Sequence, residues 1–217
     1  MSMMVLVIAS MSLPSIAASV VSDEEKAAVD REFILAPGDF EITFGDPNAP
    51  VVVTEYASLS CGHCKKFHAD IFDKIKEPYI DSGKVYFVFR YFPLNLPALR
   101  ATQLLHCLPT DAQKRTFLSA LFKAQSEWAF EKEEDAFLEK IKTIARIGAI
   151  NTAGFDNCIA NKDLEDMILM HQMTSSKQAG VRATPAIFIN GDKYVDDKLL
   201  KPFTAALGKA LKQAEKN

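Results

Sequence analysis

The 217-residue chain has no excess of charge of either sign: 25 lysine and arginine residues stand against 28 aspartate and glutamate residues, for a formal net charge of −3. This balance gives no indication of a nucleic-acid partner or of binding to a membrane surface. The sequence also lacks internal repeats and low-complexity tracts. Its ordinary composition and its length fit one domain of moderate size with a full core.

Metal and haem ligands are scarce, because the chain has only four cysteines and four histidines. Two of the cysteines lie in residues 61–64 (CGHC). A c-type haem requires a histidine directly after the second cysteine, and position 65 is Lys65. A structural zinc site needs four ligands; Cys107 and Cys158 are isolated, and His68 adds only a third ligand to the dithiol. We therefore predict no metal and no cofactor.

The N-terminal apolar stretch has no lysine or arginine before it, which departs from the usual secretory signal. Residues 3–9 are apolar, and small residues follow at Ala17 and Ala18. We predict a signal peptide at residues 1–18, followed by an N-terminal extension at residues 19–40. An uncleaved anchor is the alternative, although serines and a proline interrupt the run. Export to the periplasm would suit the cysteines, because disulfides persist in oxidising compartments.

The dithiol Cys61 and Cys64 lies between an apolar run, residues 51–57, and a segment with helical spacing. The first turn of a helix offers unpaired N–H groups and the positive end of the helix dipole, which favour a thiolate. We predict that Cys61 is the nucleophile and that the more buried Cys64 resolves the mixed disulfide. Gly62 and His63 complete the predicted catalytic motif, with His63 adding positive charge. The alternatives are a plain structural disulfide, which would close only a small loop, and a solvated His63 without a role.

The first half of the chain predicts a β-α-β unit. Residues 51–57 are β-branched and apolar and predict a buried central strand, and residues 42–44 predict an edge strand. A helix at 65–75 and a strand at 84–92 follow. Because a helix connects the two longer strands, we expect them to be parallel. We assign residues 41–94 to this first part of the fold.

A helical block follows the β-α-β unit. Residues 97–179 are rich in alanine, leucine, lysine, glutamate and glutamine, with apolar residues at helical spacing. Breaks at 108–109 (LP), Gly148 and Gly154 divide this block into about four predicted helices. We assign residues 95–181 to an inserted helical domain.

The C-terminal part returns to strands. Residues 183–189 predict a strand with a proline near its start, and 190–191 (NG) is a strong hairpin signal. Residues 193–195 are expected to pair back, and 199–214 predict an amphipathic helix. Residues 182–217 therefore form the second part of the fold, and the predicted class is α/β: a thioredoxin fold with an inserted α-helical domain.

Three motifs connect the chain to a known family. They are residues 55–64 (EYASLSCGHC), 90–94 (RYFPL) and 180–185 (GVRATP), supported by 45–50 (GDPNAP). With these motifs the chain resembles the DsbA family of bacterial secreted thiol–disulfide oxidoreductases, from about residue 39 to the C-terminus.

The resemblance implies roles for three residues near the dithiol. Pro185 matches the cis-proline of the family, with Thr184 turned toward a substrate peptide that pairs as an extra strand. From the residues alone, a proline at the beginning of a strand is an equally good interpretation. Glu55 matches a buried acid that can accept the proton of Cys64; the alternative is an exposed glutamate at the end of a strand.

Cys107 and Cys158 both fall in the helical block. Some relatives that the chain resembles carry a second, non-catalytic disulfide there, which these two cysteines would form. The alternative is a pair of buried free thiols that act as small apolar residues. Trp128 and Phe130 mark a helix boundary and are expected to pack in the core; the alternative is that they line the cleft.

The resemblance implies an exported enzyme that donates its disulfide to unfolded or reduced secreted proteins. A membrane reoxidase resembling DsbB would regenerate the disulfide, and we expect a monomer. A protein disulfide isomerase or reductase is the alternative, because Gly62-His63 and Thr184 resemble isomerases. A copper or zinc carrier is a third reading, disfavoured by the absence of further methionine or histidine ligands near the dithiol.

Overall fold

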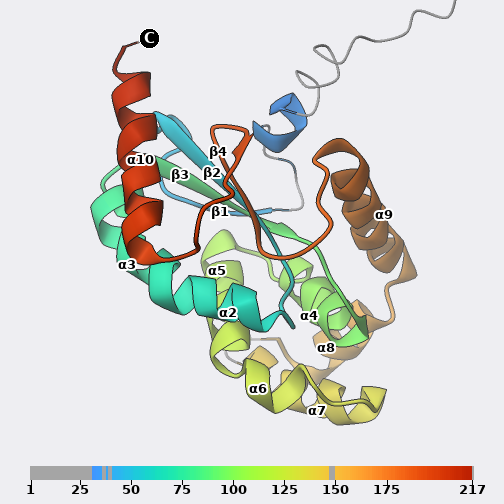
Figure 1. Ribbon diagram of the computed structural model, residues 1–217. Helices are drawn as coiled ribbons and strands as arrows, with labels where there is room; N and C mark the ends of the chain where they lie inside the picture. The colour runs from blue at the N-terminus through green and yellow to red at the C-terminus, as the bar shows by residue number, and fades with distance from the viewer. Residues whose placement is uncertain (1–30, 36–37, 39–40, 147–149, 217) are drawn as a thin grey trace, which may run out of the picture.

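Figure 1 shows the computed structural model, which describes residues 31–35, 38, 41–146 and 150–216. The predicted signal peptide and most of the predicted extension lie outside these residues. Residues 31–35 are helical. Across the described ranges, every helix is too short or too polar to cross a membrane.

A mixed five-stranded sheet forms the centre of the molecule, with the strand order β1-β3-β2-β4-β5. Parallel pairing joins β2 to β3, while the pairs β1–β3, β2–β4 and β4–β5 are antiparallel. The strands are β1 (Glu41–Phe44), β2 (Val51–Ala57), β3 (Val85–Tyr91), β4 (Ala186–Ile189) and β5 (Asp192–Lys193). The predicted parallel β-α-β unit and the edge position of the first strand are confirmed.

The two faces of the sheet belong to different apolar clusters because successive side chains of a strand point to opposite faces. In β2, Val53 packs in the larger cluster, which also holds Phe87 and Phe89 of β3. Tyr56 packs in the smaller cluster with Phe188 of β4. The first face carries the dithiol helix, and the second lies against the helical residues 31–35.

The helix that follows β2 is longer than predicted. It begins at Gly62 rather than Lys65 and continues to Asp81 through alternating α and π segments. These are α2 (Gly62–Phe67), η1 (His68–Phe72), α3 (Asp73–Ile75) and η2 (Lys76–Asp81). The wider π turns keep the run helical past Pro78, which lacks the N–H of a regular α-helix.

The helical block contains six helices in the residues that the structure describes, against about four predicted: α4 (Leu96–His106), α5 (Asp111–Lys123), α6 (Gln125–Trp128), α7 (Glu134–Ala145), α8 (Thr152–Ile159) and α9 (Lys162–Gln178). They lie below and to the right of the sheet in Figure 1. The predicted break at Gly154 is wrong: its N–H donates to Oδ1 of Asn151 at 2.8 Å, so Gly154 belongs to the capped first turn of α8. Phe130 is 67% exposed and does not pack in the core, whereas Trp128 does.

The chain re-enters the sheet after α9. Gly180, with φ +62°, ends this helix, and the Thr184–Pro185 peptide bond that precedes β4 is cis. Asn190 and Gly191, both with positive φ, form the hairpin turn to β5. Residues 200–214 form α10 (Leu200–Ala214), which packs against η1 and β2.

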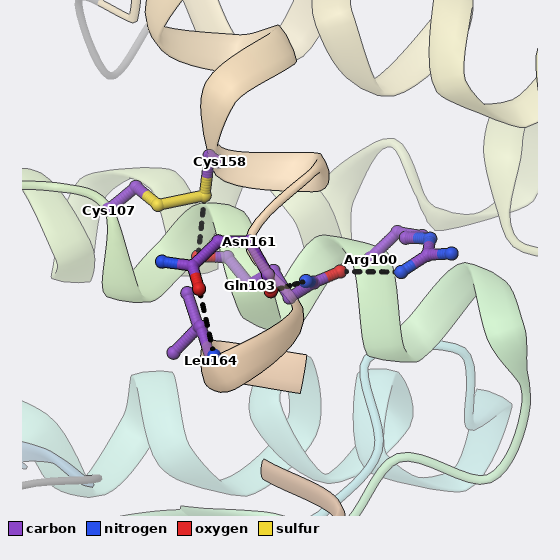
Figure 2. The surroundings of a disulfide bond; sticks show 6 residues. All are labelled: Arg100, Gln103, Cys107, Cys158, Asn161 and Leu164. Carbon is purple, nitrogen blue, oxygen red and sulfur yellow. Dashed lines mark hydrogen bonds between the residues drawn. A yellow bond between two sulfur atoms is a disulfide. The ribbon is translucent and has the colours of Figure 1, made fainter. Parts of the chain in front are cut away.

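A disulfide joins Cys107, at the end of α4, to Cys158 in α8, with a Cα–Cα distance of 6.2 Å. Figure 2 shows its surroundings. The Cys158 sulfur lies 3.1 Å from the Gln103 carbonyl oxygen, a contact without a proton because the sulfur is bonded. The Gln103 amide donates to the Asn161 carbonyl oxygen at 3.1 Å. The bridge thus ties α4 to α8, and the Gln103 hydrogen bond ties α4 to the turn between α8 and α9. Cys158 is buried, whereas Cys107 is exposed.

Replacing both Cys107 and Cys158 by alanine should lower the free energy of unfolding by about 2–4 kcal/mol, because the bridge closes a long loop of the unfolded chain. Urea denaturation of the variant and the parent, each with the Cys61–Cys64 dithiol reduced, measures the difference.

In the parent, mild dithiothreitol should reduce the Cys61–Cys64 disulfide before this bridge, because reduction of that pair releases a Cys61 thiolate whose pKa is lowered to about 5. Peptide mapping under non-reducing conditions follows both pairs. Free thiols at both Cys107 and Cys158 in protein taken from its own compartment would contradict the bridge.

Candidate active site

Cys61 occupies the N-cap position of α2 with extended backbone dihedrals. Its N–H donates to the Ser58 carbonyl oxygen at 3.0 Å, and its own carbonyl oxygen accepts the Lys65 N–H at 3.1 Å. The loop after β2 is thereby folded so that the Cys61 thiol faces the first turn of the helix. Cys61 is half-buried, while Cys64 one turn further on is fully buried.

The surroundings separate the two thiols chemically. The pKa of Cys61 is lowered from 9.0 to about 5, chiefly by a hydrogen bond from the Cys64 thiol. Partial burial opposes this shift, while the Thr184 side chain and the backbone N–H groups of Cys64 and His63 add to it. The pKa of Cys64 is raised, first by burial and then by its hydrogen bond to Cys61 and by the Glu55 carboxylate. At neutral pH one sulfur is therefore a thiolate and the other a thiol.

Thr184 lies across from the dithiol. Its carbonyl oxygen is 3.4 Å from the Cys61 sulfur, close enough to accept a hydrogen bond from the thiol form. Its side-chain hydroxyl is buried and has no other hydrogen-bond partner among the described residues. This hydroxyl lowers the pKa of Cys61, so it favours the thiolate form of Cys61. Pro185, buried and cis, directs the Thr184 backbone toward Cys61.

Glu55 is fully buried in the centre of β2 and not exposed at its end. Its Oε2 is 2.7 Å from Nε2 of His68, which is 8% exposed. From the sequence, His68 was a possible zinc ligand only, and its pairing with Glu55 was not predicted. The signal available in the sequence was the four-residue spacing between Cys64 and His68, because that spacing puts both side chains on one face of a helix.

His63 and Gly62 both lie on the exposed side of the first turn. A Cβ at Gly62 would meet no atom within 4 Å, so the backbone at this position does not require glycine. The His63 backbone N–H contributes to the low pKa of Cys61. The structure therefore brings Cys61, Cys64, Glu55 and Thr184 together and leaves the His63 side chain at the rim.

Gln125, at the start of α6, is a second residue that sequence reasoning missed. It is 2% exposed, and its amide donates to the carbonyl oxygens of Leu59 at 2.8 Å and Cys61 at 3.0 Å. This side chain fixes the dithiol loop to the helical block. No sequence pattern indicates this role, because the contact spans more than 60 residues. Among the residues placed by the structure, no cluster of three potential metal ligands occurs.

Comparisons with known proteins identify the fold and the family of the chain. Residues 39–209 match the family model described as thioredoxin. The crystal structure of alpha-DsbA1 from Wolbachia pipientis is 33% identical; the match covers 85% of this chain and 97% of that one, with a TM-score of 0.77. Oxidised BdbD from Bacillus subtilis has a TM-score of 0.65 at 22% identity, over 80% of this chain and 94% of that one, and shows the shared fold.

Two curated relatives are also similar. A putative protein-disulfide oxidoreductase of Rickettsia bellii is 24% identical over 81% of this chain, which spans 66% of the length of that relative. Disulfide bond formation protein D of Bacillus subtilis is 28% identical over 73% of this chain and 69% of that protein. The predicted thioredoxin fold with a helical insertion is confirmed, and the chain belongs to the DsbA family of thiol–disulfide oxidoreductases.

Proposed function

We propose that this chain is an exported enzyme that donates the Cys61–Cys64 disulfide to newly translocated proteins. The observation that carries the proposal is the low pKa of Cys61 at a half-exposed helix N-terminus. A thiolate that is stable in the reduced enzyme is a good leaving group, so the oxidised enzyme gives up its disulfide readily.

The donation takes place in two exchanges. A substrate thiolate attacks the Cys61 sulfur, the Cys61–Cys64 bond breaks, and the electron pair stays on Cys64, which takes up a proton. A second substrate thiolate then attacks the substrate sulfur of the mixed disulfide and releases Cys61 as a thiolate. The substrate loses two electrons and gains a disulfide; the enzyme becomes a dithiol.

Substrate peptides would bind along the backbone near Thr184. Its carbonyl oxygen lies 3.4 Å from the Cys61 sulfur and faces the position of the mixed disulfide. An extended peptide can pair with this backbone as an added strand. Such binding depends on hydrogen bonds to the main chain of the substrate rather than on its side chains, which suits an enzyme with many substrate proteins.

The cellular setting forms part of the proposal. Export through the predicted signal peptide at residues 1–18 is supported by the Cys107–Cys158 bridge, because such bridges persist in oxidising compartments. A membrane reoxidase resembling DsbB would return the dithiol to the disulfide. We propose residues 41–94 and 182–217 as the thioredoxin part, residues 95–181 as the helical insertion, and a monomer as the working form.

A disulfide isomerase or reductase is the second candidate, favoured by Thr184 before Pro185 and by Gly62-His63 between the cysteines. The equilibrium of the Cys61–Cys64 pair with glutathione separates the two functions. An oxidising potential supports the donor, and a potential near that of thioredoxin supports a reductase.

The first prediction from the active site concerns the pKa of Cys61. Alkylation of the reduced protein by iodoacetamide should show a midpoint near pH 5, far below the ordinary value of 9.0. Because the folded pKa is depressed, the contribution of the thiolate to the stability of the reduced protein is fully present above pH 9 and is lost as the pH falls through about 5. In Cys64→Ala the midpoint should rise, since the main hydrogen bond is gone. A midpoint near 9 in the parent would contradict the assignment.

The second prediction concerns the division of labour between the thiols. Cys61→Ala should abolish disulfide transfer to a reduced, unfolded client. Cys64→Ala should still react with a client disulfide but accumulate a mixed disulfide, because the resolving thiol is absent. Non-reducing electrophoresis with mass spectrometry detects the adduct. Equal alkylation rates for Cys61 and Cys64 in the reduced parent would be incompatible with these roles.

The third prediction concerns His63. The backbone N–H survives in His63→Ala, so this variant isolates the effect of the side chain. We expect a higher pKa of Cys61 and a weaker oxidant, because positive charge beside the thiolate is lost. The alkylation midpoint and the glutathione equilibrium report both changes. If neither moves, the His63 side chain is a bystander.

A further inference from the structure

Glu55 has no direct contact with solvent. The residue is 0% exposed, and its Oε1 atom is buried without a hydrogen-bond partner among the described residues. Its charge acts on Cys64, whose pKa it helps to raise. Under the proposed function Cys64 must take up a proton each time a disulfide is donated. Any proton that reaches Cys64 through Glu55 therefore needs a second group that connects Glu55 with water.

His68 is placed to make that connection. Its Nε2 is 2.7 Å from Oε2 of Glu55, and its ring is held between Phe72 and Phe122 with centroid distances of 4.8 and 4.5 Å. The other ring nitrogen, Nδ1, has no hydrogen-bond partner among the described residues. It is not among the buried polar atoms that lack a partner, so it is accessible to solvent. The side chain is 10% exposed. One nitrogen thus faces the buried carboxylate while the other is reached by solvent.

A cavity of about 680 Å³ opens on this side of His68, between the dithiol helix and α5. Its apolar lining includes Phe72 and Phe122, the two rings that hold His68. The charged groups that face it come from every helix around it: Lys65, Asp73, Lys76, Asp81, Arg115 and Lys123. Lys76 and Asp81 pair with each other at 2.7 Å. The cavity can hold water, because its volume exceeds that of many water molecules and polar groups rim it.

We propose that His68 carries protons between the water in this cavity and Glu55, as a positioning residue that acts on Cys64 through Glu55. The proposal rests on the proposed function. When the Cys61–Cys64 bond breaks, the Glu55–His68 pair gives a proton to the Cys64 thiolate. The pair then regains one proton from cavity water at Nδ1 of His68. One proton enters the protein for each disulfide donated, and no other reactant is needed.

The pH dependence of His68→Gln separates proton transfer from a purely structural role. Glutamine can keep a hydrogen bond to Glu55 but carries no proton. The measurement is the single-turnover rate at which dithiothreitol reduces the oxidised enzyme, for the variant and the parent at each pH. Dividing the rate of the variant by the rate of the parent at the same pH cancels the ionisation of the attacking thiol. We expect this quotient to fall as the pH rises from 6 to 8. At the upper end the variant should be slower than the parent by on the order of 100-fold, the lower end of the range for a positioned acid–base group.

His68→Ala tests the route directly. The deleted ring leaves a space next to the cavity, and added imidazole should restore most of the lost rate. Leu118→Ala is the matched control, because Leu118 lines the same cavity but carries no proton; imidazole should not accelerate this variant. Circular dichroism and thermal unfolding confirm that each variant is folded, and His68→Gln provides the test if His68→Ala does not fold.

The outcomes are distinct. A pH-dependent loss with imidazole rescue supports the relay. A ratio that does not vary with pH, or a parent-like rate in His68→Gln, overturns the relay and leaves disulfide donation untouched. If the parent itself does not transfer its disulfide to a reduced protein, the proposed function fails instead.

Discussion

The antiparallel pairing of β4 with β2 is the constraint on which the active-site geometry depends. Its register puts Tyr56 opposite Ala186, so the residues before β4 run beside those that follow β2. Parallel pairing with β3 along its whole length fixes β2 in the centre of the sheet. Cys61 and Thr184, 123 positions apart in the chain, are thereby brought to a sulfur–oxygen distance of 3.4 Å. A slip of one residue in this pairing would turn every side chain of β4 to the other face.

Two chemically identical thiols acquire opposite properties within one helical turn. Cys61 lies at the helix N-terminus with several donors around its sulfur, which lowers its pKa to about 5. Cys64 lies inside the apolar cluster beside the Glu55 carboxylate, and its pKa is raised. The difference comes from the surroundings: the Cys64 thiol, and then the Thr184 side chain and the backbone N–H groups at the helix end, stabilise a negative charge on Cys61, while burial and a neighbouring carboxylate disfavour one on Cys64. In the proposed donation, this asymmetry would make one sulfur the point of attack and the other the internal leaving group.

The helical insertion builds part of the site as well as covering the sheet. Gln125 of α6 holds the dithiol loop through two carbonyl oxygens, and Phe122 of α5 forms one wall for His68. Trp128, fully buried, donates to the Leu121 carbonyl oxygen at 3.1 Å and braces the turn between these helices. The helical block therefore contacts the loop that carries Cys61 directly, through the Gln125 amide.

The sequence by itself determined the dithiol on a helix start, the parallel β-α-β unit and the NG hairpin, because each of these follows from neighbouring residues: strand-forming runs, helix caps and turn chemistry. It did not determine the number of helices in the insertion, since the boundaries between α5 and α6, between α6 and α7 and between α8 and α9 carry no glycine or proline. The burial of Glu55 stayed open because the apolar strand 51–57 shows no alternation. Only the tertiary structure decided two contacts: the pairing of Glu55 with His68, and the hydrogen bond from the Gln125 amide to the Cys61 carbonyl oxygen. Such contacts join groups whose distance is set by sheet register and helix packing, and no local pattern in the sequence encodes that distance.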